Sequence, residues 1–353
     1  MSTASPAPYE TSVGVTDAMR RALAASDRVH GSTSPNPAVG CVVLDRAGTV
    51  VGTGATAPPG GPHAERTALA AAGERAVGGT AVVTLEPCNH HGRTPPCVDA
   101  LLDAGIVRVH AAVTDPNPIA AGGLERLRAA GVDVTLGTLA DEVARGPLRG
   151  WLHRQRTGRP HVTWKVASTL DGRVAAADGT SRWITGPQAR GEVHDLRRRM
   201  DAIVAGTGTV LADDPALTAR HPDGTLFADQ PLRVVVGLRD VPPGARLHTD
   251  GAAPTLHLRT RDPAEVLKDP AMRDVVDVLL EGGPILAGAF VAAGVVDRVL
   301  VHLAPALLGE GPQALGAAGV GTIADIVRLQ VDEVRRVGDD VVIDARPASG
   351  QVW

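Results

Sequence analysis

Four residues in the first third of the chain have the types and spacing of a catalytic metal site. His63 and Glu65 form an H-x-E pair at the start of an expected helix. Cys88 follows an expected strand, and Cys97 lies in the first turn of the next expected helix. Catalytic zinc typically takes three protein ligands and keeps a fourth position for water. One histidine and two cysteines match that count, and Glu65 stays free of the metal.

These groups predict the hydrolytic removal of an amino group from a heterocycle. Zinc lowers the pKa of a bound water, and helix amino termini help to keep cysteines as thiolates. Glu65 can take a proton from the water and pass it first to a ring nitrogen and then to departing ammonia. The pattern agrees with the zinc deaminase signature H-x-E followed by P-C-x-x-C, although eight residues, NHHGRTPP, separate the two cysteines here.

A structural zinc site is the competing interpretation of the same residues. Structural zinc usually has four protein ligands, and only His90 or His91 could supply the fourth one here. Neither histidine stands at a regular ligand spacing, so the pattern favours a catalytic site. A non-enzymatic zinc-stabilised scaffold is a further alternative, which a water on the metal within reach of Glu65 would exclude.

The composition is that of a globular protein that acts on small molecules. The chain has 353 residues, enough for two domains, of which 44% are hydrophobic and 21% charged. A formal net charge of −4 and the lack of clustered Lys and Arg argue against a nucleic-acid partner. Only 2% of the residues are aromatic, so polar contacts must recognise the ligand.

Cysteine usage and hydropathy favour a cytoplasmic protein without a membrane partner. Three cysteines cannot form a disulfide framework, and the first residues, MSTASPAPYETS, lack the apolar core of a signal peptide. Cys41 lies in an apolar strand and is expected in the core. The most apolar long stretch, 275–296, is interrupted by Asp277, Glu281 and Gly-Gly-Pro. It predicts a buried strand, a turn and a helix instead of a membrane span.

Helices and strands alternate along the chain, which predicts two α/β domains. The first domain covers residues 1–150, a linker rich in charge and chain breakers covers 151–160, and the second domain covers 161–353. In the first domain we expect helices at 17–25, 63–72, 95–105 and 124–130, and strands at 39–44, 50–52, 80–85, 108–113 and 132–136. In the second domain the clearest expected strands are 162–167, 202–205 and 232–237.

The metal motif and its surroundings resemble the RibD family, the bifunctional deaminase/reductases of riboflavin biosynthesis. The resemblance rests on HAE, on TLEPCNHHGRTPPC with its long cysteine spacing, on SPNPAVGCVV upstream and on DPNP downstream. It continues through TWKVASTLDGRVA, SRWITG, GTGTVLADDPALTAR, PLRVVV and LLEGGPILAGAF. These motifs span nearly the whole chain and are specific in combination.

The resemblance implies a cytidine-deaminase-like three-layer domain followed by a dihydrofolate-reductase-like α/β domain. The first domain would bind Zn²⁺ and deaminate 2,5-diamino-6-ribosylamino-4(3H)-pyrimidinone 5′-phosphate. The second would use NADPH to reduce the ribosyl group of the product, 5-amino-6-(5-phosphoribosylamino)uracil, to ribityl. We also expect a homo-oligomer, a dimer or a tetramer; which of these forms is not given by the sequence alone.

The resemblance also implies further site residues at matching positions. Asn36, whose amide can both donate and accept, and Arg93 would bind the deaminase substrate; the alternatives are a turn residue and a surface arginine. In the second domain Lys165 would be catalytic. Substrate would be held there by Ser181, Arg197, Leu217, Arg220 and Glu281. The cofactor would be lined by Ala167, Trp183, Thr209, Asp213 and a loop of Gly282, Gly283, Pro284, Ile285, Leu286, Ala287 and Gly288.

Two assignments in the second domain depend on this resemblance. Lys165 is one of two lysines in the chain, and the family would place it beside the ribose, where it helps ring opening before hydride arrives. A buried structural lysine is the alternative. No G-x-G-x-x-G motif predicts a Rossmann site. The segment Gly206-Thr207-Gly208-Thr209 is either a strand-to-helix turn or a phosphate-binding helix start, and the resemblance favours NADPH.

Departures from the family pattern bear on substrate affinity and on the alternative function. Thr56 stands where a histidine often lies, seven residues before the metal histidine, and PLRGWL lacks the usual Asn before its aromatic residue. We expect Thr56 to alter affinity without touching the zinc or Glu65. The alternative function is a monofunctional deaminase of a nucleoside or tRNA whose C-terminal half only binds or dimerises. Oxidation of NADPH that depends on the deaminated pyrimidine would exclude it.

Overall fold

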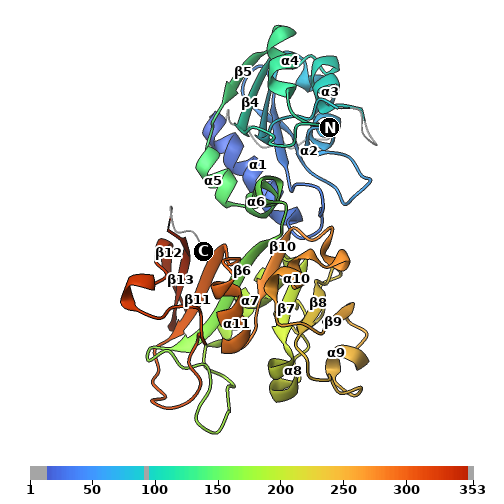
Figure 1. The fold of residues 1–353 in the computed structure, drawn as a ribbon. Coiled ribbons are helices and arrows are strands. Elements are labelled where there is room, and N and C mark those ends of the chain that lie inside the picture. Colours follow the sequence, from blue (N-terminus) through green and yellow to red (C-terminus); the bar gives the residue numbers. More distant parts are fainter. Residues whose placement is uncertain (1–13, 91–94, 349–353) are drawn as a thin grey trace, which may run out of the picture. The chain divides into compact units, whose positions relative to one another are not determined.

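The computed structural model describes residues 14–90 and 95–348 of the chain. The chain folds into two compact units, Met1–Gly158 and Arg159–Trp353. In Figure 1 the first unit runs from blue to green and the second from green to red. Each unit has its own sheet and its own helices, and each is described by itself.

The first unit is built on a five-stranded sheet with the strand order β2-β1-β3-β4-β5. Its strands are β1 (Gly40–Leu44), β2 (Val50–Ala55), β3 (Thr80–Leu85), β4 (Arg108–Val113) and β5 (Asp133–Leu136). Strand β1 is antiparallel to β2 and β3, whereas β3, β4 and β5 are parallel. Strands β1 and β3 are buried along their whole length, which explains their runs of small and β-branched residues.

Helices cover both faces of this sheet, so the unit has three layers. They are α1 (Val15–Val29), α2 (Ala64–Ala72), α3 (Cys97–Asp103), α4 (Gly123–Ala129), α5 (Ala140–Arg145) and α6 (Arg149–Thr157), with a 3-10 turn at Gly73–Ala76. A Cβ at Gly40 would lie 1.8 Å from the carbonyl oxygen of Ala22 in α1, and a Cβ at Gly52 would lie 2.0 Å from that of Ala68 in α2. The strand register places these two glycines on opposite faces. Helices α1 and α2 therefore pack on opposite faces of the sheet.

The segment predicted as a linker, 151–160, is for the most part a helix. Helix α6 continues to Thr157 and buries Gly150, Trp151 and Leu152. The apolar side chains of Trp151 and Leu152 interrupt the charged residues of this segment and are 5% and 3% exposed. Gly158, with φ 74°, ends the helix in the left-handed conformation that glycine adopts readily.

The second unit is built on an eight-stranded sheet with the order β12-β13-β11-β6-β10-β7-β8-β9. Its strands are β6 (His161–Thr169), β7 (Ala202–Gly206), β8 (Leu232–Val236), β9 (Thr255–Leu258), β10 (Asp277–Leu280), β11 (Arg298–Ala304), β12 (Leu329–Val337) and β13 (Asp340–Pro347). The six strands from β11 to β9 in this order are parallel. Strand β13 is antiparallel to both β11 and β12.

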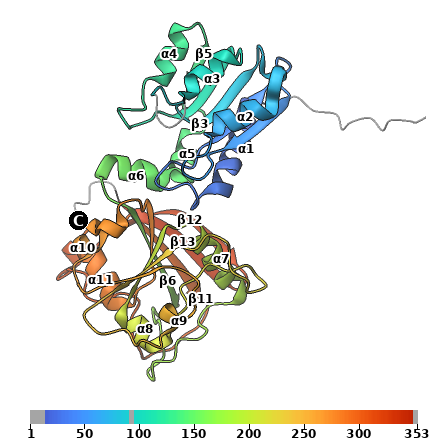
Figure 2. The ribbon, with the colours of Figure 1, turned by 90° about the vertical axis from the view of Figure 1, so that its right-hand side faces the viewer.

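Two sets of helices cover the two faces of the second sheet. They are α7 (Pro187–Arg198), α8 (Thr207–Asp213), α9 (Arg246–Thr249), α10 (Pro263–Lys268) and α11 (Pro284–Ala292), with 3-10 turns at Pro270–Met272 and Ile323–Asp325. Helices α10 and α11 pack on the face that carries Val204 and Val278. Helices α7, α8 and α9 pack on the other face, with Ile203 and Leu279. Figure 2 shows α10 and α11 on the opposite side of the strands from α7.

The apolar stretch 275–296 forms a strand, a turn and a helix, as predicted. It contains β10, the glycine pair Gly282 and Gly283, and α11. Across residues 14–90 and 95–348, no helix is long and apolar enough to span a membrane.

Candidate functional site

The three predicted metal ligands come together at the starts of two helices. His63 directly precedes α2, Cys97 is the first residue of α3, and Cys88 follows β3. A glycine in β2 lets α2 approach the sheet, because a Cβ at Gly54 would lie 2.3 Å from the carbonyl oxygen of Ala64. The ligand atoms of the histidine and the two cysteines all lie within 4.8 Å of one another.

The donor distances fit a tetrahedral zinc ion. His63 Nδ1 lies 3.5 Å from Cys88 Sγ and 3.4 Å from Cys97 Sγ. A tetrahedron with Zn–S and Zn–N distances of about 2.3 and 2.1 Å has N···S edges of about 3.6 Å. Hydrogen bonds from Cys97 and then from His63 lower the pKa of the Cys88 thiol to about 4. In the described part of the chain the cluster has three protein ligands, the number typical of a catalytic site; His91 lies outside that part.

Glu65 is buried beside the cluster without belonging to it. Its residue lies in the first turn of α2 and is 4% exposed. Burial, and then the negative charge of Cys88, raise the pKa of Glu65 to about 7. A carboxyl group that can hold or release a proton near neutral pH suits general acid–base chemistry. Cys41, on β1, is fully buried, as predicted for a core residue.

The predicted substrate residues of this site are described in part. Asn36 lies half-buried before β1, and its backbone N–H donates to the carbonyl oxygen of Thr33 at 2.9 Å. Thr56 is buried, and its Oγ1 accepts a hydrogen bond from the backbone N–H of Val39 at 3.1 Å. Thr56 therefore ties the end of β2 to the segment that carries Asn36. Arg93 lies outside the described residues.

Glu86 organises the backbone around Cys88 and was missed by sequence reasoning. Its Oε1 accepts hydrogen bonds from the backbone N–H groups of Gly122 and Leu124, at 3.1 and 3.0 Å. Its Oε2 accepts from the N–H of Asp115 at 3.1 Å. Glu86 thus fixes the DPNP segment and the start of α4 against the turn after β3. Its position in the Glu-Pro-Cys motif was the available signal.

In the second unit, Lys165, Glu281 and Arg197 form one charged group. The register pairs Leu280 of β10 with Trp164 of β6, so Lys165 and Glu281, each one residue further along, lie side by side. Arg197 of α7 pairs with Glu281 at two points, with Nε–Oε1 2.6 Å and Nη2–Oε2 2.9 Å. This structure therefore brings together three residues that the resemblance had placed at the reductase site.

The ionisation of this group follows from burial and from its neighbouring charges. Burial alone would raise the pKa of Glu281, but the charge of Arg197 and its hydrogen bonds lower it to about 2. Burial lowers the pKa of Lys165, and the charge of Glu281 acts in the opposite direction. At neutral pH the pair of Arg197 and Glu281 is fully charged, and Lys165 lies next to it.

The other predicted substrate residues lie in two segments near this group. Ser181 Oγ donates a hydrogen bond to Asp213 Oδ1 at 3.3 Å. Leu217 packs in the core and has a positive φ of 46°, so only its backbone is free to meet a ligand. Arg220 Nε donates to Thr218 Oγ1 at 3.0 Å, and Arg197 Nη1 donates to the carbonyl oxygen of the same threonine at 3.1 Å.

The predicted cofactor residues lie on β6, in the segment before α7, in α8 from Thr209 to its last residue Asp213, and from Gly282 into α11. Ala167 is two residues after Lys165 and therefore on the same face of β6. Trp183 is 69% exposed, and the guanidinium of Arg190 lies 4.6 Å from its ring centroid. A Cβ at Gly283 would lie 3.8 Å from Thr209 Oγ1, so α8 and the start of α11 are neighbours.

The expected cofactor loop, 282–288, is a loop only at Gly282 and Gly283. Helix α11 begins at Pro284, because proline suits the first position of a helix. The first turns of this helix are formed by Pro284, Ile285, Leu286, Ala287 and Gly288. Ala287 is fully buried, and a Cβ at Gly288 would lie 2.4 Å from the carbonyl oxygen of Ala317. These last two residues serve packing.

His302 is a buried histidine next to the charged group, and sequence reasoning missed it. The register pairs His302 with Ala167 and pairs Leu300, two residues earlier, with Lys165. Ala167 and Lys165, on the same face of β6, are both predicted site residues. The residue is 1% exposed, and neither ring nitrogen has a hydrogen-bond partner within the described residues. Burial, and then the charge of Lys165, lower the pKa of His302 to about 4. The ring is therefore neutral at pH 7.

We expect His302 to make the second unit less stable in acid. In the unfolded chain its pKa is about 6.5, so the unfolded state takes up a proton before the folded state does. Stability should fall by about 2 kcal/mol between pH 7 and pH 5 through this residue. Urea unfolding at both pH values should show a smaller loss in His302→Phe than in the parent chain. His248→Phe, at an exposed position, is the control; equal losses in all three proteins would contradict the prediction.

Comparison with known proteins identifies both units. Residues 15–113 match the cytidine and deoxycytidylate deaminase zinc-binding region, and residues 160–343 match the RibD C-terminal domain. The chain is 55% identical to the riboflavin biosynthesis protein RibD of Mycobacterium tuberculosis, over 93% of this chain and 96% of that protein. It is 42% identical to RibD of Escherichia coli, over 92% of this chain and 97% of the relative.

Solved structures agree over the same extent. RibD of Acinetobacter baumannii (form 1) has a TM-score of 0.84 and 36% identity, with coverage of 95% of this chain and 99% of that chain. The diaminohydroxyphosphoribosylaminopyrimidine deaminase/5-amino-6-(5-phosphoribosylamino)uracil reductase of Thermotoga maritima has a TM-score of 0.85 and 31% identity, with the same coverage. The predicted fold class is confirmed, and so are the two cofactors, zinc for the first unit and NADPH for the RibD-type reductase. The chain belongs to the RibD family and is a bifunctional deaminase/reductase of riboflavin biosynthesis.

Proposed function

We propose that this chain catalyses two consecutive steps on one phosphorylated pyrimidine. It removes an amino group from 2,5-diamino-6-ribosylamino-4(3H)-pyrimidinone 5′-phosphate and then reduces the ribosyl group of the product to ribityl. The observation that carries this proposal is that each unit holds its own set of reactive groups. The first has a three-ligand cluster with a buried carboxyl group beside it, and the second has a lysine beside a buried ion pair. The named reactions of the Thermotoga maritima relative support this order of steps.

In the deaminase unit we assign the metal to His63, Cys88 and Cys97. Zinc, when bound, activates a water molecule for attack on the amino-bearing ring carbon. Glu65 takes the proton released by that water, delivers it to a ring nitrogen, and finally protonates the departing ammonia. Asn36 binds the pyrimidine through its amide, which can donate and accept, and Arg93 contacts the substrate or its phosphate.

In the reductase unit we assign the ribose end of the site to Lys165. NADPH, when bound, supplies the hydride that reduces the sugar. Lys165 donates a proton to the ring oxygen of the ribosyl group, so that the ring opens and can accept the hydride. The pair of Arg197 and Glu281, with Ser181, the backbone of Leu217, and Arg220, holds the substrate. Arginine suits the phosphate because its planar guanidinium can donate two parallel hydrogen bonds.

The cofactor side of the reductase is assigned to the segments that meet at the starts of α8 and α11. We assign a phosphate of the cofactor to the N–H groups in the first turn of α11 that follow Pro284, which itself has none. Trp183 offers an exposed aromatic surface, and the guanidinium of Arg190 lies over its ring. Ala167, Thr209 and Asp213 complete this side.

We also propose a cellular setting and an assembly for the enzyme. We place the enzyme in the cytoplasm, since Cys41, Cys88 and Cys97 form no disulfide in the structure. The homo-oligomer, a dimer or a tetramer, stays a prediction that sedimentation of the purified chain can test.

A two-signal assay tests the proposed function and the independence of the two sites. The diaminopyrimidine substrate and NADPH are supplied together, and ammonia release and NADPH oxidation are followed in the same sample. We expect oxidation to follow ammonia. A zinc chelator should stop ammonia release, whereas oxidation should continue when the deaminated pyrimidine is supplied directly, because the metal cluster and Lys165 belong to different units. Ammonia release without any oxidation would restrict the function to the first unit.

A further inference from the structure

The segment between α8 and β8 has an unusual backbone at the place where the reductase substrate is assigned. Asp214 and Leu217 have positive φ values of 41° and 46°. Residues with a side chain rarely adopt this left-handed conformation, and they keep it only where the surrounding structure holds them. Leu217 cannot contribute its side chain to a ligand, because that side chain is buried in the core. The backbone of this segment must therefore be held in place by other groups.

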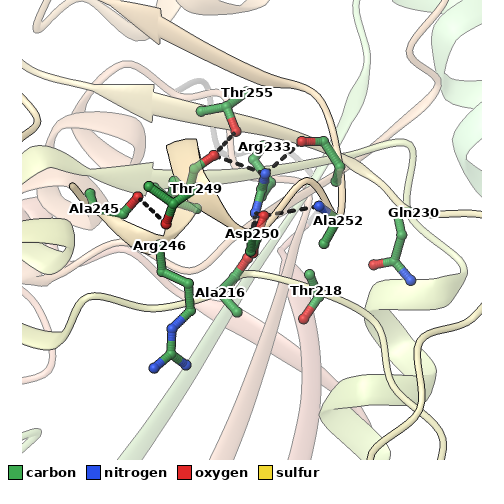
Figure 3. Close-up of polar contacts among 12 residues, drawn as sticks. Ala216, Thr218, Gln230, Arg233, Ala245, Arg246, Thr249, Asp250, Ala252 and Thr255 are labelled. Carbon is green, nitrogen blue, oxygen red and sulfur yellow. Dashed lines mark hydrogen bonds and ion pairs between the residues drawn. The ribbon is translucent and has the colours of Figure 1, made fainter. Parts of the chain in front are cut away.

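The side chain of Arg233, on β8, lies buried beneath this segment. The residue is 1% exposed and is among the largest fully buried side chains of the described chain. Its Nη1 donates a hydrogen bond to the carbonyl oxygen of Ala216 at 3.1 Å. The same nitrogen donates to Oδ1 and Oδ2 of Asp250 at 3.0 and 2.9 Å. Its Nη2 donates to the carbonyl oxygens of Leu247 and Ala253 at 2.9 and 2.5 Å. Figure 3 shows this guanidinium at the centre of the network.

The other partners of Arg233 lie in the stretch of chain from α9 to β9, which hydrogen bonds of its own hold in place. Asp250 also accepts a hydrogen bond from the N–H of Ala252 at 3.0 Å, and Thr255 Oγ1 donates to the carbonyl oxygen of Leu247 at 3.0 Å. A second hydrogen bond joins this stretch to the segment between α8 and β8, since the N–H of Arg246 donates to Asp214 Oδ1 at 2.8 Å. Arg233 therefore connects the segment to a turn that is held by its own hydrogen bonds (Figure 3).

On its other side the same segment is hydrogen-bonded to the charged group of Lys165, Glu281 and Arg197. The carbonyl oxygen of Thr218 accepts from Arg197 Nη1 at 3.1 Å, and Arg197 pairs with Glu281 beside Lys165. The amide of Gln230 bonds both the N–H and the carbonyl oxygen of Ala219 at 2.9 Å. Leu217 thus lies between a carbonyl group held by Arg233 and one held by Arg197.

We propose that Arg233, neutralised by Asp250, is a positioning residue for the reductase substrate. It acts through the backbone: it fixes Ala216, so that the Leu217 peptide groups and the following Arg220 stand at the phosphorylated pyrimidine. This inference rests on the proposed function of the second unit. It predicts an effect on substrate affinity that is separate from cofactor affinity and from deamination.

The test uses the full chain with Arg233→Met and measures both reductase KM values. We expect the KM for 5-amino-6-(5-phosphoribosylamino)uracil to rise at least about tenfold, and the KM for NADPH and the rate of ammonia release to stay within about twofold. Arg233→Lys keeps one charged donor and should recover part of the affinity. Asp250→Asn keeps the shape of the partner and should raise the same KM by a smaller factor, and it supplies the test where Arg233→Met does not fold.

Arg298→Met is the matched control. Arg298 forms a comparable, largely buried pair with Asp344, with Nε–Oδ1 2.8 Å, between β11 and β13 of the same unit. Its loss should lower stability to urea without changing either KM. An unchanged pyrimidine KM in folded Arg233→Met would overturn the proposal, and so would equal changes in Arg298→Met. Failure of the unsubstituted chain to oxidise NADPH would instead contradict the proposed function.

Discussion

Glu65→Gln will lower ammonia release by about 10²- to 10⁴-fold, the usual contribution of a positioned acid or base. Glutamine has nearly the same size and can still form hydrogen bonds, but it cannot take up and release a proton. The change should not weaken the fold, because burial already disfavours the charged carboxylate at this position. The zinc content should stay the same, since the ligand cluster consists of His63, Cys88 and Cys97.

The measurement combines ammonia release, metal content and NADPH oxidation with the deaminated pyrimidine as substrate. Only the first should change in Glu65→Gln. Glu74→Gln is the matched control, because Glu74 lies exposed in the 3-10 turn directly after α2. Full ammonia release by the zinc-loaded Glu65→Gln protein would show that another group moves the proton. Loss of zinc together with activity would mean that Glu65 supports the cluster instead.

The deaminase site could be predicted in detail because its ligands stand at the ends of regular elements. The expected strand 80–85 coincides with β3, and the expected helix 63–72 differs from α2 by one residue. His63, at the boundary, precedes the helix instead of beginning it. One ligand directly precedes a helix, the second follows a strand, and the third begins the next helix. Local structure therefore fixes the position of each ligand, and the spacing of the ligands in the sequence carries most of the geometry of the site.

The reductase site depends on the order of strands, which periodicity does not reveal. Glu281 meets Lys165 because β10 pairs with β6, although α7, β7, α8, β8, α9, β9 and α10 separate these two strands in the sequence. Arg197 reaches Glu281 from a helix 84 positions away along the chain. The resemblance named these residues, but their contact is a property of the tertiary structure.

Three buried polar residues, Glu86, Arg233 and His302, were predicted by neither pattern nor resemblance. Arg233 stands in PLRVVV and His302 in an apolar strand, and by composition both would be expected to face solvent. Each is buried because other parts of the chain supply carbonyl, N–H or apolar surroundings, and the sequence does not state which parts meet.

Lys165→Met will lower the rate of NADPH oxidation at least about 100-fold while ammonia release continues at the parent rate. Methionine has a similar length and no charge, so it removes the proton donor and little else. The buried carboxylate of Glu281 remains neutralised by the two hydrogen bonds from Arg197, so no unpaired charge is left in the core. We therefore expect a folded enzyme that binds both reductase substrates and reduces the sugar slowly.

The chain provides its own matched control, because Lys268 is its other lysine and lies exposed at the end of α10. Lys268→Met should behave like the parent chain in both assays. Lys165→Arg separates charge from proton donation: arginine keeps a positive charge beside Glu281, but its guanidinium is larger and does not give up a proton. If Lys165 acts only through its charge, Lys165→Arg will retain most of the rate. If it delivers the proton for ring opening, Lys165→Arg will be nearly as slow as Lys165→Met, and unchanged kcat in Lys165→Met would remove Lys165 from the reaction altogether.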